Sequence, residues 1–210
     1  MVIRLLALPL ALVAFHSSIH PLTPSVRAEL KAGFWQPACP VPLSKLRVLT
    51  VVYQGFDNRP HTGQIIVNAD AAAPLARVFG RLYELRFPIR HMRIADHYGP
   101  IRSQPADGDV SGAFECRPPR PSPCTRGKVP TGWSEHAYGE AVDLNPLENP
   151  YVGCGQVFSP ATRPYLDRTR LRRGMITPAV VRAFRGIGWG WGGDWAGSTK
   201  DYPHFSATGH

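Results

Sequence analysis

Two short segments far apart in this chain carry side chains that could close on a single metal ion. The first, Ser134-Glu-His-Ala-Tyr-Gly-Glu-Ala-Val-Asp143, contains His136 and Asp143, and the second, Asp201-Tyr-Pro-His204-Phe, contains His204. Three such ligands leave the fourth tetrahedral position on zinc open, which is the arrangement of a catalytic metal site. Any fold that uses them must bring the C-terminal end of the chain back to residues 134–143. A spare carboxylate at Asp201 could then act as a general base, and this combination indicates a zinc hydrolase.

The local pattern around each ligand fits this convergence. The turn-like Ala-Tyr-Gly139 is followed by a short alternating strand in which Asp143 faces the same side as Ala141 and Asn145. Pro146 ends that strand. The residue before a proline is extended rather than helical, so Tyr202-Pro203 favours a strand carrying His204.

Each part of the pattern is weak when taken alone. A His-x6-Asp pair occurs by chance in many chains, and a lone histidine near a C-terminus is usually a surface residue. The combination of these ligands with Ser134, Asp201 and the Gly/Trp-rich run 186–195 is far more specific. A serine-nucleophile interpretation of Ser134 is weak, because no Gly-x-Ser-x-Gly elbow is present and the spacing to His136 does not suit it.

With these motifs, the chain resembles the zinc D-Ala-D-Ala carboxypeptidase and L-Ala-D-Glu endopeptidase family, the VanY-like peptidoglycan peptidases. The resemblance extends from about Cys39 to Phe205 and rests on Ser-x-His-x6-Asp, the Gly/Trp-rich run and Asp-x-x-His-Phe. Three further pieces, residues 87–93, 111–117 and 145–151, look like the secreted actinobacterial branch of that family.

The resemblance implies a role for individual residues. Zinc, one ion per chain, would be held by His136, Asp143 and His204, and Asp201 would be the base. Arg117 is the nearest match to the family's arginine that polarises the scissile carbonyl. Asp201 stands where the carboxypeptidases usually carry glutamate, which is closer to the endopeptidase branch. The insert at residues 118–132 is longer than the family pattern and is expected to shape one wall of the cleft.

The N-terminal end reads as an export signal, which we place at residues 1–28. Arg4 precedes an apolar run, Leu5 to Phe15, that is too short to span a bilayer, and Val26-Arg-Ala28 offers small residues for cleavage. A retained membrane anchor is the alternative. We therefore expect a secreted protein, associated with the cell wall and monomeric, without a stable membrane span once the signal is removed.

The chain is strongly basic, with a formal net charge of +9. Removal of residues 1–28 would take away two arginines and no acidic residue, so the remainder would stay basic. Such a protein is attracted to anionic surfaces, and anionic cell-wall polymers are therefore candidate partners beside the peptidoglycan stem peptides. The basic residues are scattered, apart from Arg168–Arg173, and no nucleic-acid-binding module is present, so we expect no nucleic-acid partner.

The four cysteines are not arranged as CxxC pairs, and with an export signal they read as two disulfides rather than a metal site. The residues alone permit three pairings. The family pattern has cysteines at the positions of Cys39 and Cys116, which implies that these two pair. Cys124, in the insert, would then pair with Cys154.

The remaining elements indicate one domain of residues 46–210 after an extended lead-in, residues 29–45. Residues 46–55 and 62–68 predict a hairpin, residues 71–86 a helix with an apolar stripe, residues 92–98 a strand, and residues 177–184 a helix with Thr177 as N-cap. The fold class is therefore α+β, a small antiparallel sheet flanked by helices, with the zinc site at the mouth of the sheet.

Flat side chains near the ligands are candidates for substrate contacts. Trp189 is equally well explained as a core residue, whereas Trp191 and Trp195 are predicted to line the cleft. Ser134 is predicted to hydrogen-bond substrate or a ligand. Together these features predict a secreted zinc peptidase acting on peptidoglycan stem peptides. A wall-binding protein that keeps the fold without turnover is the alternative, and the complete ligand set argues against it.

Overall fold

The computed structural model describes residues 14–125 and 131–210. The fold is α+β, as predicted, and within these residues the strands form three small sheets. The helices are α1 (Pro24–Gly33), α2 (Ala69–Glu84), α3 (Ile94–Tyr98), α4 (Glu135–Tyr138) and α5 (Pro178–Arg185). The 3₁₀ helices are η1 (Leu43–Lys45), η2 (Ile101–Ser103), η3 (Pro123–Thr125), η4 (Pro160–Tyr165) and η5 (Gly192–Asp194).

The largest sheet is built around the predicted hairpin, β2 (Leu46–Gly55) and β3 (Pro60–Asn68). β1 (Ser17–Pro21) pairs antiparallel with β2, and the short β4 (Pro88–Ile89) pairs parallel with the end of β2. Side chains alternate across the hairpin, as the period of two in a strand requires. Leu49 and Val51 therefore face one apolar core, whereas Leu46 and Val48 face another.

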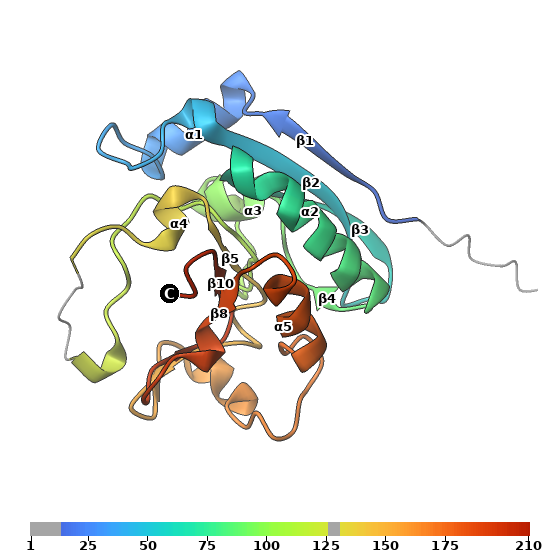
Figure 1. Ribbon diagram of the computed structural model, residues 1–210, viewed down its shortest axis with the longest axis vertical. Coiled ribbons are helices and arrows are strands. Elements are labelled where there is room, and N and C mark those ends of the chain that lie inside the picture. The colour runs from blue at the N-terminus through green and yellow to red at the C-terminus, as the bar shows by residue number, and fades with distance from the viewer. Residues whose placement is uncertain (1–13, 126–130) are drawn as a thin grey trace, which may run out of the picture.

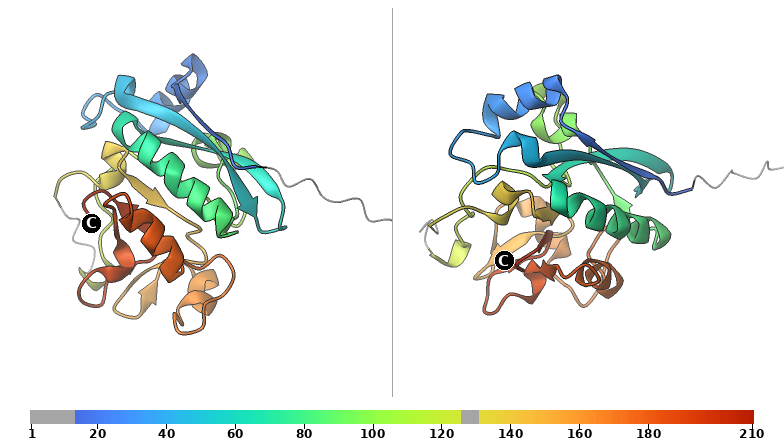
Figure 2. Two further views of the ribbon diagram at one scale, coloured as in Figure 1. Left: turned by 45° about the vertical axis from the view of Figure 1, so that its right-hand side comes forward. Right: turned by 45° about the horizontal axis from the view of Figure 1, so that its top comes forward.

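The two cores lie on opposite faces of this sheet. Helix α2 lies along one face of the hairpin, and α5 packs beyond α2 (Figures 1 and 2). The second core is formed with α1 and α3 and includes Leu30 and Ile94. This arrangement leaves the C-terminal half of the chain to build the remaining two sheets beside α2 and α5.

The two C-terminal sheets each have three short strands. The first has the order β5 (Ala141–Asp143), β10 (His204–Ser206), β8 (Gly190–Trp191). The second has the order β7 (Gln156–Val157), β6 (Tyr151–Gly153), β9 (Lys200–Asp201). Phe205 anchors the first sheet to α5, because its ring stacks on Phe184 with centroids 3.8 Å apart. The pairing of β5 with β10 thus brings residues 141–143 and 204–206 together, as the pattern of predicted ligands requires.

Two sequence predictions of local structure were wrong. Residues 29–33 are not extended but complete α1, which Thr23 caps by accepting a hydrogen bond from the Val26 amide. Residues 94–98 are helical rather than a strand, because the Asp96 carboxylate accepts from the Arg93 backbone amide and pairs with the Arg93 side chain. Local capping outweighed the lack of apolar periodicity in the first segment and the strand-like pattern in the second.

The predicted export signal falls partly outside the described residues. Of residues 1–28, positions 14–28 are described, and they include β1 and the start of α1. β1 is mostly exposed, so it contributes little to the core, although Leu22 after it is buried. Cleavage after Ala28 stays a prediction. Among the described residues, no helix has both the length and the apolar character to cross a membrane.

A buried polar clamp fixes the chain after β5. Asn145 adopts a positive φ of 45°, and its side-chain amide donates to the carbonyl oxygens of Pro88 and Gly174. Asn149 donates to the carbonyl oxygens of Leu144, Asn145 and Gly174 and accepts from the Ile176 amide. The segment that follows Asp143 is thus held by side-chain amides rather than by regular secondary structure.

The same segment carries a buried cluster of charges. The Arg90 guanidinium donates to Asp109 at 2.9 Å and to Glu148 at 2.5 Å, and it also lies over the Phe56 ring. Burial raises the pKa of Glu148 to about 7, with Asp109 adding to the rise and Arg90 opposing it. One guanidinium therefore serves two buried carboxyl groups, and a proton on Glu148 balances their charges near neutral pH.

We predict that Asn149→Ala lowers the free energy of unfolding by about 2–4 kcal/mol, because it removes several buried hydrogen bonds and leaves their partners unsatisfied. Urea denaturation followed by circular dichroism would measure this. Lys31→Ala, at an exposed position of α1, is the control and should change stability by no more than about 0.5 kcal/mol. Equal stability of the Asn149 variant and wild type would show that the clamp does not stabilise the fold.

A second prediction concerns pH. The pKa of Glu148 is raised from 4.5 to about 7 in the folded chain, so between these values the folded state binds more protons than the unfolded state. The stability that this group contributes is therefore fully present below pH 4.5 and is lost as pH rises through about 7. Consequently, the stability of wild type relative to Glu148→Gln should fall between pH 5 and pH 8 in urea titrations. A constant or rising difference would contradict the buried, protonated carboxyl group.

Candidate functional site

Three side chains from separate elements meet at one point beside the first C-terminal sheet. His136 comes from α4, Asp143 from the end of β5 and His204 from the start of β10. His204 and Asp143 are directly opposite each other in the antiparallel β5–β10 pair. Side chains of directly opposed residues share one face of a sheet, so the pairing alone brings these two ligands together.

The three ligand atoms form a nearly equilateral triangle. His136 Nε2 lies 3.2 Å from His204 Nδ1 and 3.3 Å from Asp143 Oδ1, and His204 Nδ1 lies 3.2 Å from Asp143 Oδ1. Burial alone would raise the pKa of Asp143, but the two histidines lower it well below its ordinary range. The carboxylate is therefore ionised at the vertex where it faces both imidazole rings.

The other nitrogen of each histidine already has a partner. His136 Nδ1 donates to the carbonyl oxygen of Ala113 at 2.5 Å, and His204 Nε2 donates to the main-chain oxygen of His210 at 3.1 Å. These bonds orient both rings so that the other nitrogen of each points into the triangle, where it can bind a metal ion once its proton is released. Hydrogen bonds from the outer ring nitrogen to a main-chain oxygen are typical of histidines that bind metal ions.

The chain conformation around His136 depends on two turns. Ser134 caps α4 by accepting from the His136 amide at 3.4 Å, and Gly139 ends the helix with a positive φ of 69°. A β-carbon at Gly139 would lie 2.7 Å from the Asn68 amide nitrogen, so only glycine fits where α4 docks on β3. Asn68 secures this contact by donating its backbone amide to Gly139 O and its side-chain amide to Tyr138 O.

A single main-chain segment supports two of the ligands. Gly112 exchanges two backbone hydrogen bonds with Asp143, and the next residue, Ala113, accepts the bond from His136. The segments 87–93, 111–117 and 145–151, which carry part of the family resemblance, also contact one another here. Ser111 donates its backbone amide to His91 O and accepts from the Asn145 amide, and Asn145 accepts from the Arg90 amide.

These residues fit a tetrahedral metal ion. Ligand atoms about 2.0–2.1 Å from zinc in a tetrahedral site lie about 3.3–3.4 Å apart, which agrees with the observed triangle. Two imidazole nitrogens and a carboxylate oxygen are donors that suit zinc. The His136, Asp143 and His204 group could therefore hold one metal ion.

Asp201 lies in the same cleft on β9. Burial raises its pKa to about 6, and the negative charge of Asp143 adds to the rise. A cation in the triangle would act in the opposite direction. A β-carbon at Gly192 would lie 2.3 Å from Asp201 O, so glycine at this position permits β9 to pack against η5. The carboxyl group is thus held close to the predicted ligands in an environment that favours proton exchange near neutral pH.

Arg117 lines this cleft, and two residues that the sequence analysis missed accompany it. Its guanidinium forms an ion pair with Glu115, and Glu115 lies 3.7 Å from the Nε2 of His97. Burial lowers the pKa of His97. The backbone amide of Glu115 donates to His136 O, which ties this group to the metal-ligand helix. Glu115 is only two residues before Arg117 in the chain, whereas His97, on α3, approaches the pair only through the tertiary fold.

The predicted substrate-contacting residues separate into two groups. Ser134 and Trp195 line the cleft, and the Trp195 ring lies 5.8 Å from that of His204. Trp191 does not line it: its ring packs on Phe205, and its Nε1 donates to Tyr202 O at 2.8 Å. Trp189 is buried in the core beside Phe184, in agreement with its core interpretation.

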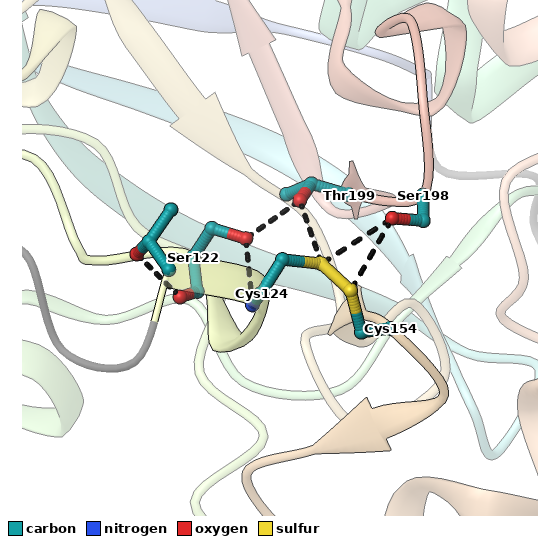
Figure 3. Close-up of a disulfide and its surroundings, with 6 residues drawn as sticks. Ser122, Cys124, Cys154, Ser198 and Thr199 are labelled. Atoms are coloured by element: carbon teal, nitrogen blue, oxygen red, sulfur yellow. Dashed lines mark hydrogen bonds between the residues drawn. A yellow bond between two sulfur atoms is a disulfide. The ribbon is translucent and has the colours of Figure 1, made fainter.

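The cleft has a volume of about 940 Å³ and is bounded on one side by the insert. The structure contains two disulfides, Cys39–Cys116 and Cys124–Cys154, the pairings that the sequence analysis favours. Figure 3 shows the second, which joins η3 of the insert to the turn after β6, with Ser198 within 3.4 Å of both sulfur atoms. Ser122 and Thr199 are hydrogen-bonded at 2.6 Å beside it. The described part of the insert therefore forms a cleft wall that is covalently fixed.

The comparisons with known proteins agree with this geometry. Residues 128–207 match a family model described as D-alanyl-D-alanine carboxypeptidase. No curated protein and no solved structure matches the chain. The matched residues include the three predicted ligands and Asp201, so the resemblance to this family is confirmed for that part of the chain. Arg117 and the Cys39–Cys116 disulfide lie before it.

We predict that the purified protein binds about one equivalent of a divalent metal ion, because one set of mutually close ligands is present in the described chain. Metal analysis after gel filtration would measure it. His136→Ala should bind much less, whereas His61→Ala, a histidine paired with Asp57 away from the cleft, should bind as wild type does. Equal metal content in wild type and His136→Ala would overturn the ligand assignment.

Proposed function

We propose that this chain is a secreted zinc metallopeptidase that hydrolyses a peptide bond in peptidoglycan stem peptides. One observation carries the proposal: His136, Asp143 and His204 converge in a cleft that also contains the buried carboxyl group of Asp201. A ligand triad with one open position and an adjacent base is the arrangement that metal-assisted hydrolysis needs.

The proposed chemistry divides among few groups. When bound, a zinc ion would supply a Lewis acid and lower the pKa of a coordinated water molecule to about 7. Asp201 would accept the proton of the attacking water and afterwards deliver it to the leaving amine. Burial raises the pKa of Asp201 to about 6 in the metal-free chain, and the charge of a bound cation would oppose this rise.

Arg117 is the proposed donor to the carbonyl oxygen as negative charge develops there. It lines the cleft, and its ion pair with Glu115 restricts the position of the guanidinium. A donor held in position before the reaction stabilises the oxyanion without having to reorganise. Ser134 and Trp195 also line the cleft and are proposed to contact substrate, whereas Trp191, half-buried against Phe205, is proposed to have a packing role.

Substrate class and location rest on four observations. The family match favours a peptidase similar to D-alanyl-D-alanine carboxypeptidases. Two disulfides suit an oxidising compartment, and the apolar N-terminal run supports export. The net charge of +9 would draw the protein to anionic wall polymers. Mass spectrometry of muropeptides after incubation would identify the bond: loss of one alanine indicates a carboxypeptidase, and cleavage after the muramyl-linked L-Ala indicates an endopeptidase.

We predict that Asp201→Asn keeps its metal but loses about 10²–10⁴-fold in kcat, because an amide cannot accept the proton of water. Hydrolysis of a stem peptide and metal content would be measured on the same preparation. Asp194→Asn, an exposed aspartate paired with Arg185, is the matched control and should retain activity. Near wild-type turnover by Asp201→Asn would exclude Asp201 as the base. No turnover by wild type with metal bound would instead favour a wall-binding protein without catalysis.

A further inference from the structure

Two stacked aromatic rings, Tyr151 and Phe158, line the cleft, although neither residue belongs to the motifs that contain the predicted ligands. Phe158 is 64% exposed, and its ring stacks on that of Tyr151 with centroids 5.6 Å apart and an interplanar angle of 25°. Both residues line the same cleft as the metal-ligand triad. Within the part of the chain that the structure describes, the other exposed large apolar side chains do not line it: Ile19, Ile101, Leu166 and Leu171. An exposed aromatic ring inside a cleft indicates a ligand contact.

The sheet register places this stack next to the proposed base. Tyr151 on β6 lies directly opposite Asp201 on β9 in an antiparallel pair. Opposed residues of such a pair project from the same face of the sheet, with β-carbons about 4.5–5.5 Å apart. One ligand could therefore contact the Tyr151–Phe158 stack and also reach Asp201.

The stack is mounted on a rigid support. Tyr151 and Phe158 flank the β6–β7 hairpin, whose turn is fixed to η3 by Cys124–Cys154 and contacted by Ser198 (Figure 3). A β-carbon at Gly153 would lie 2.9 Å from the Pro123 ring, which shows how closely the hairpin and the insert approach. A surface fixed in this way loses little conformational entropy when it binds a ligand.

The surroundings of the rings favour an amphipathic ligand. The polar side chains of Arg120, Ser122, Ser159 and Thr162 line the cleft together with the stack. A hexopyranose presents an apolar face of C–H groups to an aromatic ring and hydroxyl groups at its edge to polar neighbours. The cleft volume of about 940 Å³ lies near the upper end of the range for small-ligand sites. This volume is larger than one dipeptide would fill.

We propose that the Tyr151–Phe158 stack is a saccharide subsite, which binds a hexopyranose ring of the glycan to which the stem peptide is attached. This inference rests on the proposed function for its choice of substrate. It adds a specificity that the metal centre cannot supply: the protein should distinguish a stem peptide still linked to sugar from the same peptide released.

The test compares two substrates of identical peptide sequence, one free and one carrying its N-acetylated disaccharide. Wild type should have a kcat/KM about tenfold higher for the disaccharide-linked peptide. Phe158→Ala should lose about 5–10-fold on that substrate through KM, with kcat unchanged, and should match wild type on the free peptide. Phe158→Tyr should restore the preference, and Leu171→Ala, exposed outside the cleft, should not alter it.

The outcomes separate this inference from the proposed function. An equal loss on both substrates would assign Phe158 to the peptide-binding surface, and no loss on either would leave it without a role in binding; both results overturn the saccharide subsite. If wild type cleaves neither substrate, the proposed function fails, and calorimetric titration of wild type and Phe158→Ala with the free disaccharide still decides the subsite. Binding by wild type that Phe158→Ala loses would support it, and no binding by wild type would overturn it.

Discussion

The antiparallel register between β5 and β10 is the constraint on which the rest of the site depends. It places His204 opposite Asp143, and the next pair in the register, Phe205 and Val142, points to the core. A slip of one residue would exchange the two faces, burying the ligands in the apolar core and exposing Phe205. The stack of Phe205 on Phe184 therefore stabilises the metal-ligand geometry as well as the core. Packing of the apolar face of β10 therefore determines where its polar side chain, His204, lies.

Electrostatics within the cleft is set by burial and by the pairing of charges. Asp143 stays ionised because two histidines face it, whereas Asp201 and Glu148 have raised pKa values because burial outweighs their positive neighbours. Carboxyl groups in one half of the chain thus have different environments: Asp143 is held ionised, whereas Asp201 and Glu148 have pKa values close to neutral pH. Environments that shift neighbouring carboxyl groups in different directions are typical of hydrolytic sites.

Much of this organisation could be predicted from the sequence, but only where the signal is local. The β2–β3 hairpin, α2 and α5 follow from period-two and period-3.6 apolar patterns and from Thr177 as a cap. The ligand set follows from spacing and family resemblance. By contrast, α3 was predicted as a strand because its Arg93–Asp96 cap is a side-chain contact that apolar periodicity does not report. The glycine-rich run predicts Trp191 in the cleft, but the spacing of glycines does not reveal whether a ring faces the cleft or the core.

Residues that act through tertiary contacts were not predictable. His97 comes beside Glu115 and Arg117 from α3, and Tyr151 reaches Asp201 only because β6 and β9 pair. No alternation or motif links these positions along the chain. Such contacts become visible only when the two C-terminal sheets and the insert are assembled in space.

The support of His136 and Asp143 by the main chain of Gly112 and Ala113 has a consequence for which sequences this site tolerates. Neither residue offers a functional group beyond its backbone, yet a β-carbon at Gly112 would lie 2.7 Å from the His97 ring, and the Ala113 side chain is buried in the core. A bulkier residue at either position would displace this segment and with it the backbone contact to Asp143 or His136. The predicted metal site therefore imposes an upper size limit at two positions whose side chains contact neither ligand.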